Sequence, residues 1–305
     1  MKDNNFQVAV IGGGLGGLCL AQGLKKAGVR VAVYERDETP DSRTQGYRIH
    51  IDPQGSTALQ QCLPGHLWDV FETTGGVFSQ GFSVVTEELR ELLSLSLDSN
   101  IDSSVARHRS ISRITLRRIL LAGLEDNVQF GKRFSRYEES ASGLVTVYFE
   151  DGSCVEADVL VGADGVSSRV RKQYLPAAEP IDTGVVGIGG KVPLTNGVLA
   201  LAPGPLLRGP LIVMPPAPCC LFMAMWKRLS DSDQSLRVIG VDERLAGDED
   251  YLIFALGGRP DYFDLPADFD SAPGSKLKEV LRRAAVDWHP DLRKIIEIAM
   301  KGRCS

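Results

Sequence analysis

Unbroken apolar runs and helical apolar spacing alternate at the start of the chain. Residues 8–11 form a short, wholly apolar run, typical of a parallel strand that is covered on both faces. After it, Leu20, Leu24 and Ala27 fall on one face of a predicted helix. A second strand is predicted over 29–34. The pattern predicts a unit of strand, helix and parallel strand.

The middle of the chain contains both the alternating pattern of strands and the apolar stripe of an amphipathic helix. Residues 145–149 alternate between apolar and polar, which predicts a half-buried strand, and Asp151-Gly152 after them is a hairpin turn signal. Residues 159–161 form another buried run. The segment 110–124 has the apolar stripe of one amphipathic helix, with Ser112 as a candidate N-cap.

The pattern changes after residue 180. Four apolar segments separated by proline, glycine and charged loops predict strands; they are 183–194, 209–216, 219–226 and 251–258. In 219–226, Phe222, Ala224 and Trp226 are expected on one face, with Leu221, Met223 and Met225 on the other. Residues 276–288 predict one helix whose apolar face includes Trp288.

Composition and charge narrow the class of protein. The 305 residues are 43% apolar and 24% charged, with a net charge of −5, which is typical of a globular protein and unlike a nucleic-acid-binding one. No apolar run approaches the roughly 20 residues of a membrane span, and the N-terminus lacks a signal-peptide layout. The six cysteines show no metal-binding spacing, so we expect reduced thiols, a cytoplasmic location and no metal.

A glycine-rich loop follows the first strand. Gly12, Gly14 and Gly17 have the spacing G-x-G-x-x-G, and Glu35 ends the second strand. Gly12 permits a tight turn, Gly14 lets the backbone approach a pyrophosphate, and Gly17 lets the helix pack closely. Glu35 stands where a carboxylate accepts hydrogen bonds from a ribose. The unit predicts dinucleotide binding; the glycines do not distinguish NAD from FAD, and a nucleotide-free glycine turn is the alternative.

Two further stretches carry candidate chemistry. The run 159–161 ends in G-A-D-G, and Ser167 or Ser168 could cap a helix after it. Arg113 falls in the first turn of the helix predicted over 110–124, where a cation is unfavourable beside the helix dipole. A residue that breaks a local rule often has another role; a solvated surface arginine is the alternative.

With these stretches together, the sequence resembles the single-component FAD-dependent monooxygenases related to p-hydroxybenzoate hydroxylase. The glycine unit ending in Glu35-Arg36 matches their first fingerprint. Their second fingerprint, D-G-x-x-S-x-x-R, matches Asp164, Gly165, Ser168 and Arg171. Arg113 matches a helix whose arginine contacts FAD in the family.

The resemblance implies a fold class and cofactors. The fold is α/β: a Rossmann-like FAD-binding domain with an interleaved substrate domain built on an antiparallel sheet. FAD is the implied cofactor, with NADPH or NADH as co-substrate. The implied contacts are Gly12, Gly14, Gly17, Glu35, Arg36, Arg48, Arg113, Asp164 and Gly165. The family's chemistry belongs to the flavin, so no catalytic base is assigned, and the four histidines are expected to be structural.

The resemblance also implies domain limits. Residues 1–180 are expected to form the FAD-binding domain, with about 76–97 lending strands to a substrate sheet formed by 181–275. Residues 276–305 are expected to lead back to an FAD domain that is incomplete. The family's third fingerprint, a Gly-Asp motif with following prolines and glycines, has no match, because Gly247-Asp248 lacks them. We therefore expect a C-terminally truncated chain.

The implied activity is insertion of one oxygen atom from O2 into an aromatic or alkenyl small molecule. Salicylate-type relatives often carry an arginine where this chain has Gly189, which favours a bulkier, less charged substrate. A reductase or dehydrogenase on the same fold is an alternative. A truncated product that binds FAD weakly and does not turn over is another.

Overall fold

The computed structural model describes residues 6–40, 42, 48–77, 81–96, 108–227, 236–237, 250–265 and 273–299. By internal contacts the chain divides into two compact units. Unit 1 comprises Met1–Gly75, Ser103–Ile181 and Leu229–Gly247, and unit 2 comprises Gly76–Asp102, Asp182–Arg228 and Asp248–Ser305. The rejected Gly247-Asp248 pair and the chain end at 300–305 lie outside the described residues.

Unit 1 is built on a parallel sheet. Its strands are β1 (Gln7–Ile11), β2 (Arg30–Tyr34), β8 (Val128–Gln129) and β12 (Val159–Gly162), in the order β12-β1-β2-β8. Helix α1 (Leu15–Lys26) joins β1 to β2, as the apolar pattern predicts, and Gly28 follows it with a φ of 74°.

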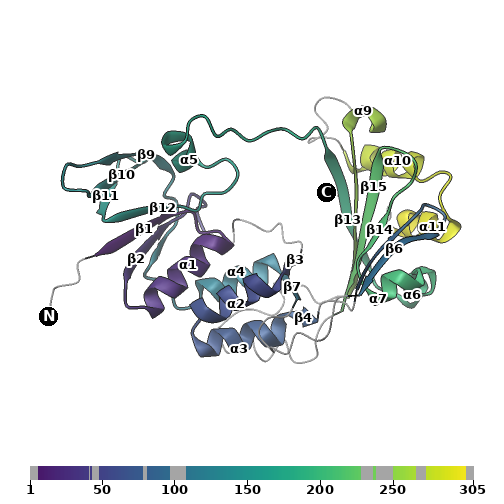
Figure 1. Ribbon diagram of the computed structural model, residues 1–305, viewed down its shortest axis with the longest axis horizontal. Helices are drawn as coiled ribbons and strands as arrows, with labels where there is room; N and C mark the ends of the chain where they lie inside the picture. Colours follow the sequence, from purple (N-terminus) through teal and green to yellow (C-terminus); the bar gives the residue numbers. More distant parts are fainter. Residues whose placement is uncertain are drawn as a thin grey trace. The chain divides into compact units, whose positions relative to one another are not determined.

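One face of this sheet packs on helices. Besides α1, these are α2 (Pro53–Cys62), α3 (Gly65–Thr74) and α4 (Arg113–Leu121), which lie together in Figure 1. Their shared core contains Val8 and Val10 of β1, and fully buried Leu18, Phe71 and Leu120 from the helices. The pair β3 (Arg48–Ile51) and β7 (Arg109–Ser112) is antiparallel, and α2 and α4 follow its two strands.

The opposite face packs on a small antiparallel sheet of β9 (Phe134–Glu139), β10 (Val145–Phe149) and β11 (Cys154–Ala157), in the order β11-β10-β9. Ala9 and Ile11 point into this second core, which also holds Val147 and Phe149. Alternate residues of β1 are thus buried on opposite faces, as the unbroken apolar run predicts. The predicted hairpin turn at Asp151-Gly152 is confirmed, since it joins β10 to β11 and Gly152 has a φ of 82°.

The helix predicted over 110–124 is shorter than expected. Residues up to Ser112 pair with β3 as strand β7, and the helix occupies only Arg113–Leu121. Ser112 is its N-cap as predicted, because its hydroxyl accepts a hydrogen bond from the Thr115 N–H at 3.4 Å. The amphipathic pattern did not show the strand because half-buried serines such as Ser110 and Ser112 suit a helix cap as well as a strand.

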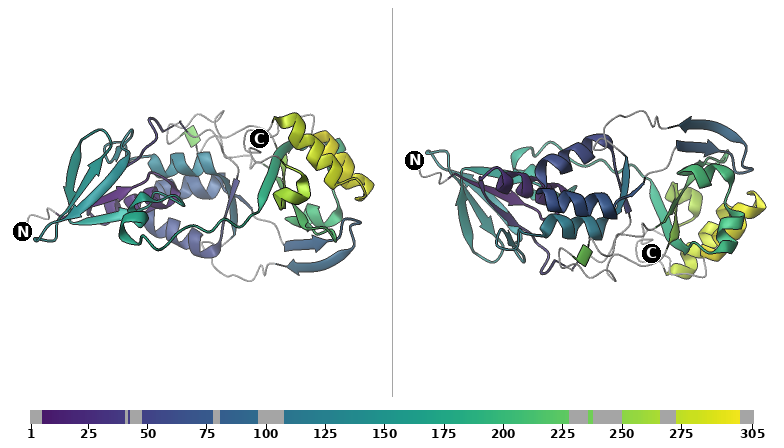
Figure 2. Two further views of the ribbon diagram at one scale, coloured as in Figure 1. Left: turned by 90° about the horizontal axis from the view of Figure 1, so that it is seen from above. Right: turned by 90° about the horizontal axis from the view of Figure 1, so that it is seen from below.

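Unit 2 contains a six-stranded sheet in the order β13-β16-β15-β14-β5-β6. The strands are β5 (Gly81–Val85), β6 (Glu91–Ser96), β13 (Val186–Pro193), β14 (Leu211–Val213), β15 (Cys219–Trp226) and β16 (Tyr251–Gly258). All neighbours are antiparallel except β14 and β5, which are parallel. Figure 2 shows the early β5–β6 hairpin at one edge of the sheet, beside strands from much later in the chain.

Helices cover one face of this sheet. They include α6 (Asn196–Leu201), α7 (Gly204–Arg208), α10 (Gly274–Ala284) and α11 (Pro290–Ala299), with α9 (Pro260–Phe263) after β16. Leu221 and Met223 are buried in their core, whereas Phe222 on the opposite face is 37% exposed. The predicted division of the β15 side chains between two faces is therefore confirmed at these positions.

The single helix predicted over 276–288 is wrong at its C-terminal end. α10 stops at Ala284, and Trp288 lies in the turn before α11, although it is buried in the same core. Pro290 begins α11, because proline is well suited to a first helical turn, so the helical pattern resumes there as a separate helix.

Candidate functional site

A cavity of about 560 Å³ lies in unit 1, where the parallel strands β1, β2 and β12 end. Ligands of open α/β sheets bind at the carboxyl ends of the strands. The cavity is lined by Ile11, Gly12, Gly14, Leu15, Gly16, Tyr34, Glu35, Arg36, Ile49, Arg113, Lys132, Arg133, Phe134, Ala163, Asp164, Gly165, Val166, Ser167 and Arg169.

The glycine loop is fitted closely on one side and open on the other. Gly12 has a φ of +109°, and a Cβ there would lie 2.4 Å from the Ala163 carbonyl oxygen. A Cβ on Gly17 would lie 2.1 Å from the Gly12 carbonyl oxygen, so Gly17 supports the loop from beneath and does not line the cavity. A Cβ on Gly14 would meet nothing within 4 Å. The loop therefore presents bare backbone to the cavity at Gly14, beside the N-terminus of α1.

Glu35 organises this loop before any ligand binds. Its side chain is only 3% exposed, and its Oε2 accepts a hydrogen bond from the Gly13 N–H at 2.6 Å. Its Oε1 accepts another from the Asp37 N–H at 3.0 Å. The Glu35 N–H donates to the Gln129 carbonyl of β8 at 2.9 Å. The carboxylate thus joins the glycine loop to the end of β2.

Asp164 has a structural role in the loop after β12. Its Oδ1 accepts a hydrogen bond from the Ser168 hydroxyl at 2.5 Å, and its Oδ2 accepts one from the Arg169 N–H at 2.7 Å. Ser168 in turn caps α5 (Arg169–Tyr174), which decides between the two serines considered as caps. Gly165 adopts a φ of +80° and lines the cavity beside Asp164.

The three arginines proposed from sequence have different positions. Arg113 and Arg36 are exposed and line the cavity, and Arg113 makes no hydrogen bond or ion pair with the residues that the structure describes. Arg48 is not among the lining residues. Its Nε donates to the Ser110 hydroxyl at 3.0 Å, and its Nη2 donates to the Ser110 carbonyl.

Three further cations lie at the rim of the cavity, and two of them, Lys132 and Arg133, were not predicted. Lys132 donates to Asp151 at 2.6 Å, which holds the pKa of that carboxyl well below its usual range. Arg133 and Arg169 both pair with Glu150, at 3.4 and 2.5 Å. The β10–β11 turn therefore holds a row of positive charge beside the cavity.

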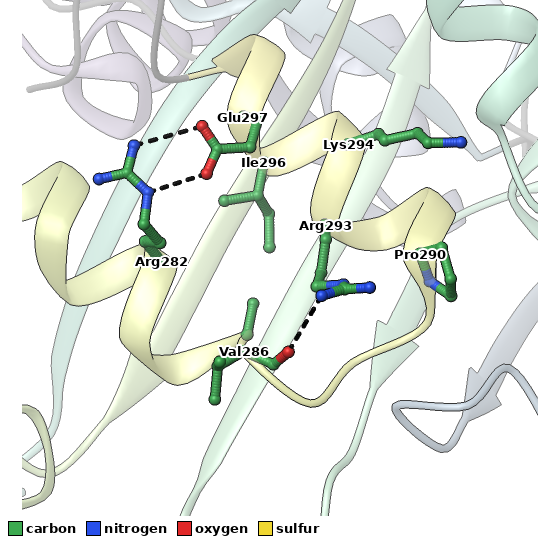
Figure 3. A pocket seen from close by; sticks show the side chains of 8 residues that line it. Arg282, Val286, Pro290, Arg293, Lys294, Ile296 and Glu297 are labelled. Carbon is green, nitrogen blue, oxygen red and sulfur yellow. Dashed lines mark hydrogen bonds and ion pairs between the residues drawn. The ribbon is translucent and has the colours of Figure 1, made fainter.

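Unit 2 has a different pocket, between α10 and α11. It is a cavity of about 270 Å³ that Arg282, Val286, Arg293 and Glu297 help to line (Figure 3). Arg282 donates to both carboxylate oxygens of Glu297, at 2.9 and 3.3 Å, so its charge is already paired. No glycine is among the residues that line this pocket, and it does not resemble a nucleotide site.

A glycine loop at the end of a parallel strand, a buried carboxylate after the next strand and basic groups at the rim define a dinucleotide-binding α/β protein. The chain belongs to the family of FAD binding domains, whose model matches residues 5–198. None of the described helices is long and apolar enough to cross a membrane.

Individual relatives agree with this family. The chain is 29% identical to the dual O-methyltransferase/FAD-dependent monooxygenase elcB of Phaeosphaeria nodorum, over 95% of this chain and 34% of elcB. A crystal structure assigned as an FAD-containing monooxygenase from Photorhabdus luminescens is 34% identical, with a TM-score of 0.82, over 98% of this chain and 74% of that one. The complex of Klebsiella pneumoniae HpxO with FAD and uric acid is 26% identical, with a TM-score of 0.70, over 98% and 67%. The chain spans about a third of the length of elcB.

Proposed function

We propose that this protein is an FAD-dependent, NAD(P)H-consuming monooxygenase that inserts one oxygen atom from O2 into an aromatic or alkenyl small molecule. The observation that carries the proposal is the cavity at the glycine loop, where Glu35 and the bare backbone at Gly14 face the same space. Membership of the family of FAD binding domains supports FAD as the dinucleotide.

The residues fit the adenosine diphosphate half of FAD. The backbone at Gly14 and the N-terminus of α1 would hold the pyrophosphate, and Glu35 would accept hydrogen bonds from the ribose. Arg36 and Arg113 would contribute positive charge near the cofactor. Gly12 and Gly17 shape the loop, while Asp164 and Gly165 form the opposite wall. Arg48 is proposed only as a more distant contact, because it lies outside the cavity lining.

Unit 1 is proposed as the FAD-binding domain and unit 2 as the substrate domain. When bound, FAD supplies the redox chemistry and the activation of O2. The protein's own residues bind and orient the cofactor and exclude water from it. The described cysteines are free, which supports a reducing compartment such as the cytoplasm.

The substrate would lie against the open face of the six-stranded sheet, defined here as the face opposite α10 and α11. Gly189 pairs across the sheet with Ala255, and Gly187 pairs with Gly257, so four small residues adjoin one another on this face. Phe222 stands beside Ala255 on the next strand. A Cβ on Gly187 would meet nothing within 4 Å. This flat surface of small residues, beside the aromatic ring of Phe222, suits a planar, bulky and weakly charged molecule better than a small carboxylate.

Two measurements, made one after the other, test the proposal. Titration of the purified chain with FAD, followed by flavin fluorescence, should give saturable binding. NADPH or NADH oxidation in the presence of aromatic compounds, with 18O2 and mass spectrometry of the products, should then show incorporation of one oxygen atom. FAD binding without any oxygenated product would favour the non-catalytic alternative, and the absence of FAD binding would overturn the cofactor assignment.

A further inference from the structure

Two cysteines from different helices lie against each other in unit 1. Cys19 is in the second turn of α1, and Cys62 is the last residue of α2. Their side chains share a hydrogen bond. Both residues are partly exposed, so a small oxidant can reach them. The family assignment and the proposed catalysis make no use of either thiol.

Gly23 explains why the two thiols can approach. It lies one helical turn after Cys19 and therefore on the same face of α1. A Cβ built on Gly23 would lie 2.9 Å from the Cys62 sulfur, so the sulfur occupies the space that a side chain would fill. Removing that side chain lets the C-terminal end of α2 rest directly on α1. The contact is therefore part of the helix packing and does not depend on one flexible rotamer.

We propose that Cys19 and Cys62 form a modification site: a thiol pair that a peroxide oxidises to an intramolecular disulfide joining α1 to α2. The oxidant class is hydrogen peroxide or an organic hydroperoxide. The inference does not depend on the proposed monooxygenase activity.

The order of the two steps follows from the surroundings of the thiols. Burial, together with the neighbouring Cys62, raises the pKa of Cys19 to about 12, so Cys19 remains a protonated thiol at neutral pH. We therefore assign the first attack on the peroxide to the Cys62 sulfur. Its sulfur bonds to one peroxide oxygen, the O–O bond breaks, and the second oxygen leaves as water or, from a hydroperoxide, as an alcohol.

The second step closes the cross-link. The Cys19 sulfur attacks the Cys62 sulfenic acid, the S–O bond breaks, and hydroxide leaves with the Cys19 proton as a second molecule of water. Two thiols are oxidised by two electrons, and one peroxide is reduced. The new bond closes the segment from Cys19 to Cys62, which carries the glycine loop's partner Glu35 and the cavity residue Ile49. Closing such a loop restricts the unfolded chain more than the folded one.

The test uses the full chain, purified under reducing conditions and then treated with hydrogen peroxide. Non-reducing peptide mapping by mass spectrometry should find the Cys19 and Cys62 peptides joined. The melting temperature should rise by about 5 °C or more, because the disulfide constrains the unfolded state. The rise should disappear on reduction with dithiothreitol.

Three variants sharpen the test. Cys62→Ser and Cys19→Ser should each abolish the joined peptide and the rise in melting temperature, whereas Cys154→Ser, at an exposed cysteine of β11, should leave both unchanged. Gly23→Ala keeps both thiols but displaces the Cys62 sulfur, so it should slow cross-linking several-fold. The proposal is overturned if peroxide carries Cys62 to sulfinic acid without joining Cys19. It is also overturned if Cys62→Ser shows the same rise in melting temperature as the parent chain.

Discussion

The nucleotide cavity of unit 1 and the open face of unit 2 are built from similar small residues in opposite ways. In the glycine loop beside the cavity, Gly12 and Gly17 are required because neighbouring backbone occupies the space of a side chain, as Gly17 shows against the Gly12 carbonyl. On the open face, a Cβ built on Gly187 would meet nothing within 4 Å, so a side chain would fit there. A closely packed glycine in the glycine loop is needed for the backbone conformation. A glycine on the open face leaves space beside the strand.

This difference separates what a motif can encode from what it cannot. A pyrophosphate site depends on backbone conformation, so only a few sequences can form it, and a short motif identifies it. A face that binds a planar molecule depends on the sizes of side chains from several strands. Many sequences can produce such a face, and the sequence alone does not distinguish a substrate-binding surface from a weakly packed sheet.

The largest effect should come from Gly17→Ala. Its Cβ would be forced to within 2.1 Å of the Gly12 carbonyl oxygen, and backbone must move to relieve the clash. We expect the free energy of unfolding to fall by about 3 kcal/mol, as for an overpacked core position, with loss of FAD binding. Chemical denaturation and FAD titration measure both. Gly16→Ala is the matched control for stability, since its Cβ meets no protein atom within 4 Å; equal losses of stability in the two variants would refute the close fit.

Glu35→Gln should reduce FAD affinity by about tenfold or more while preserving the fold. The amide keeps the shape but replaces a charged acceptor, which is worth roughly 1.5–3 kcal/mol in a charge-assisted hydrogen bond. Equilibrium titration with FAD is the measurement. Glu38→Gln, at an exposed carboxylate nearby, is the control and should bind FAD normally. An unchanged affinity in Glu35→Gln would show that the carboxylate serves only the loop.

Arg113→Ala should separate a ligand role from a structural one. Arg113 is exposed and contacts no described partner through a hydrogen bond or ion pair, so the apo protein should keep its stability within about 0.5 kcal/mol. Removing a cation from the first turn of α4 is itself slightly favourable. FAD retention during gel filtration should nevertheless fall. If the apo protein is destabilised by more than this, Arg113 is structural.

The smallest effects should come from a pair of glycines on opposite faces of β13. Gly187→Ala fills open space and removes a flexible residue from a strand, so stability should rise by about 0.5–1 kcal/mol. Gly190→Ala would place a Cβ 2.9 Å from the Phe254 ring and should reduce stability instead. FAD affinity should not change in either variant. Thermal unfolding measures the contrast, and a shift of the same sign in both would contradict the assignment of faces.

The strands could be predicted from sequence more reliably than the ends of helices. Residues 8–11 and 219–226 match β1 and β15 because an unbroken apolar run and a burial alternation are both local patterns. Residues 110–112 of the helix expected over 110–124 belong to strand β7, and the end of the helix expected over 276–288 belongs to a turn, because pairing with β3 and packing in the core override helical periodicity. Among the site residues, Lys132 and Arg133 could not be anticipated, because their positions depend on carboxylates from the β10–β11 turn.

The parallel pairing of β14 with β5 has a consequence for synthesis on the ribosome. The β5–β6 hairpin is translated more than a hundred residues before Leu211 of β14, the first strand able to receive it in the sheet. At about 5–20 residues per second the hairpin waits on the order of 10 s, and a lone hairpin is only marginally stable in water. Leu92, Leu93 and Leu95 remain exposed even in the folded unit. During that interval the nascent chain therefore exposes the leucine-rich β5–β6 hairpin, which is prone to aggregate. The yield of the protein in cells should depend on chaperones that bind this hairpin.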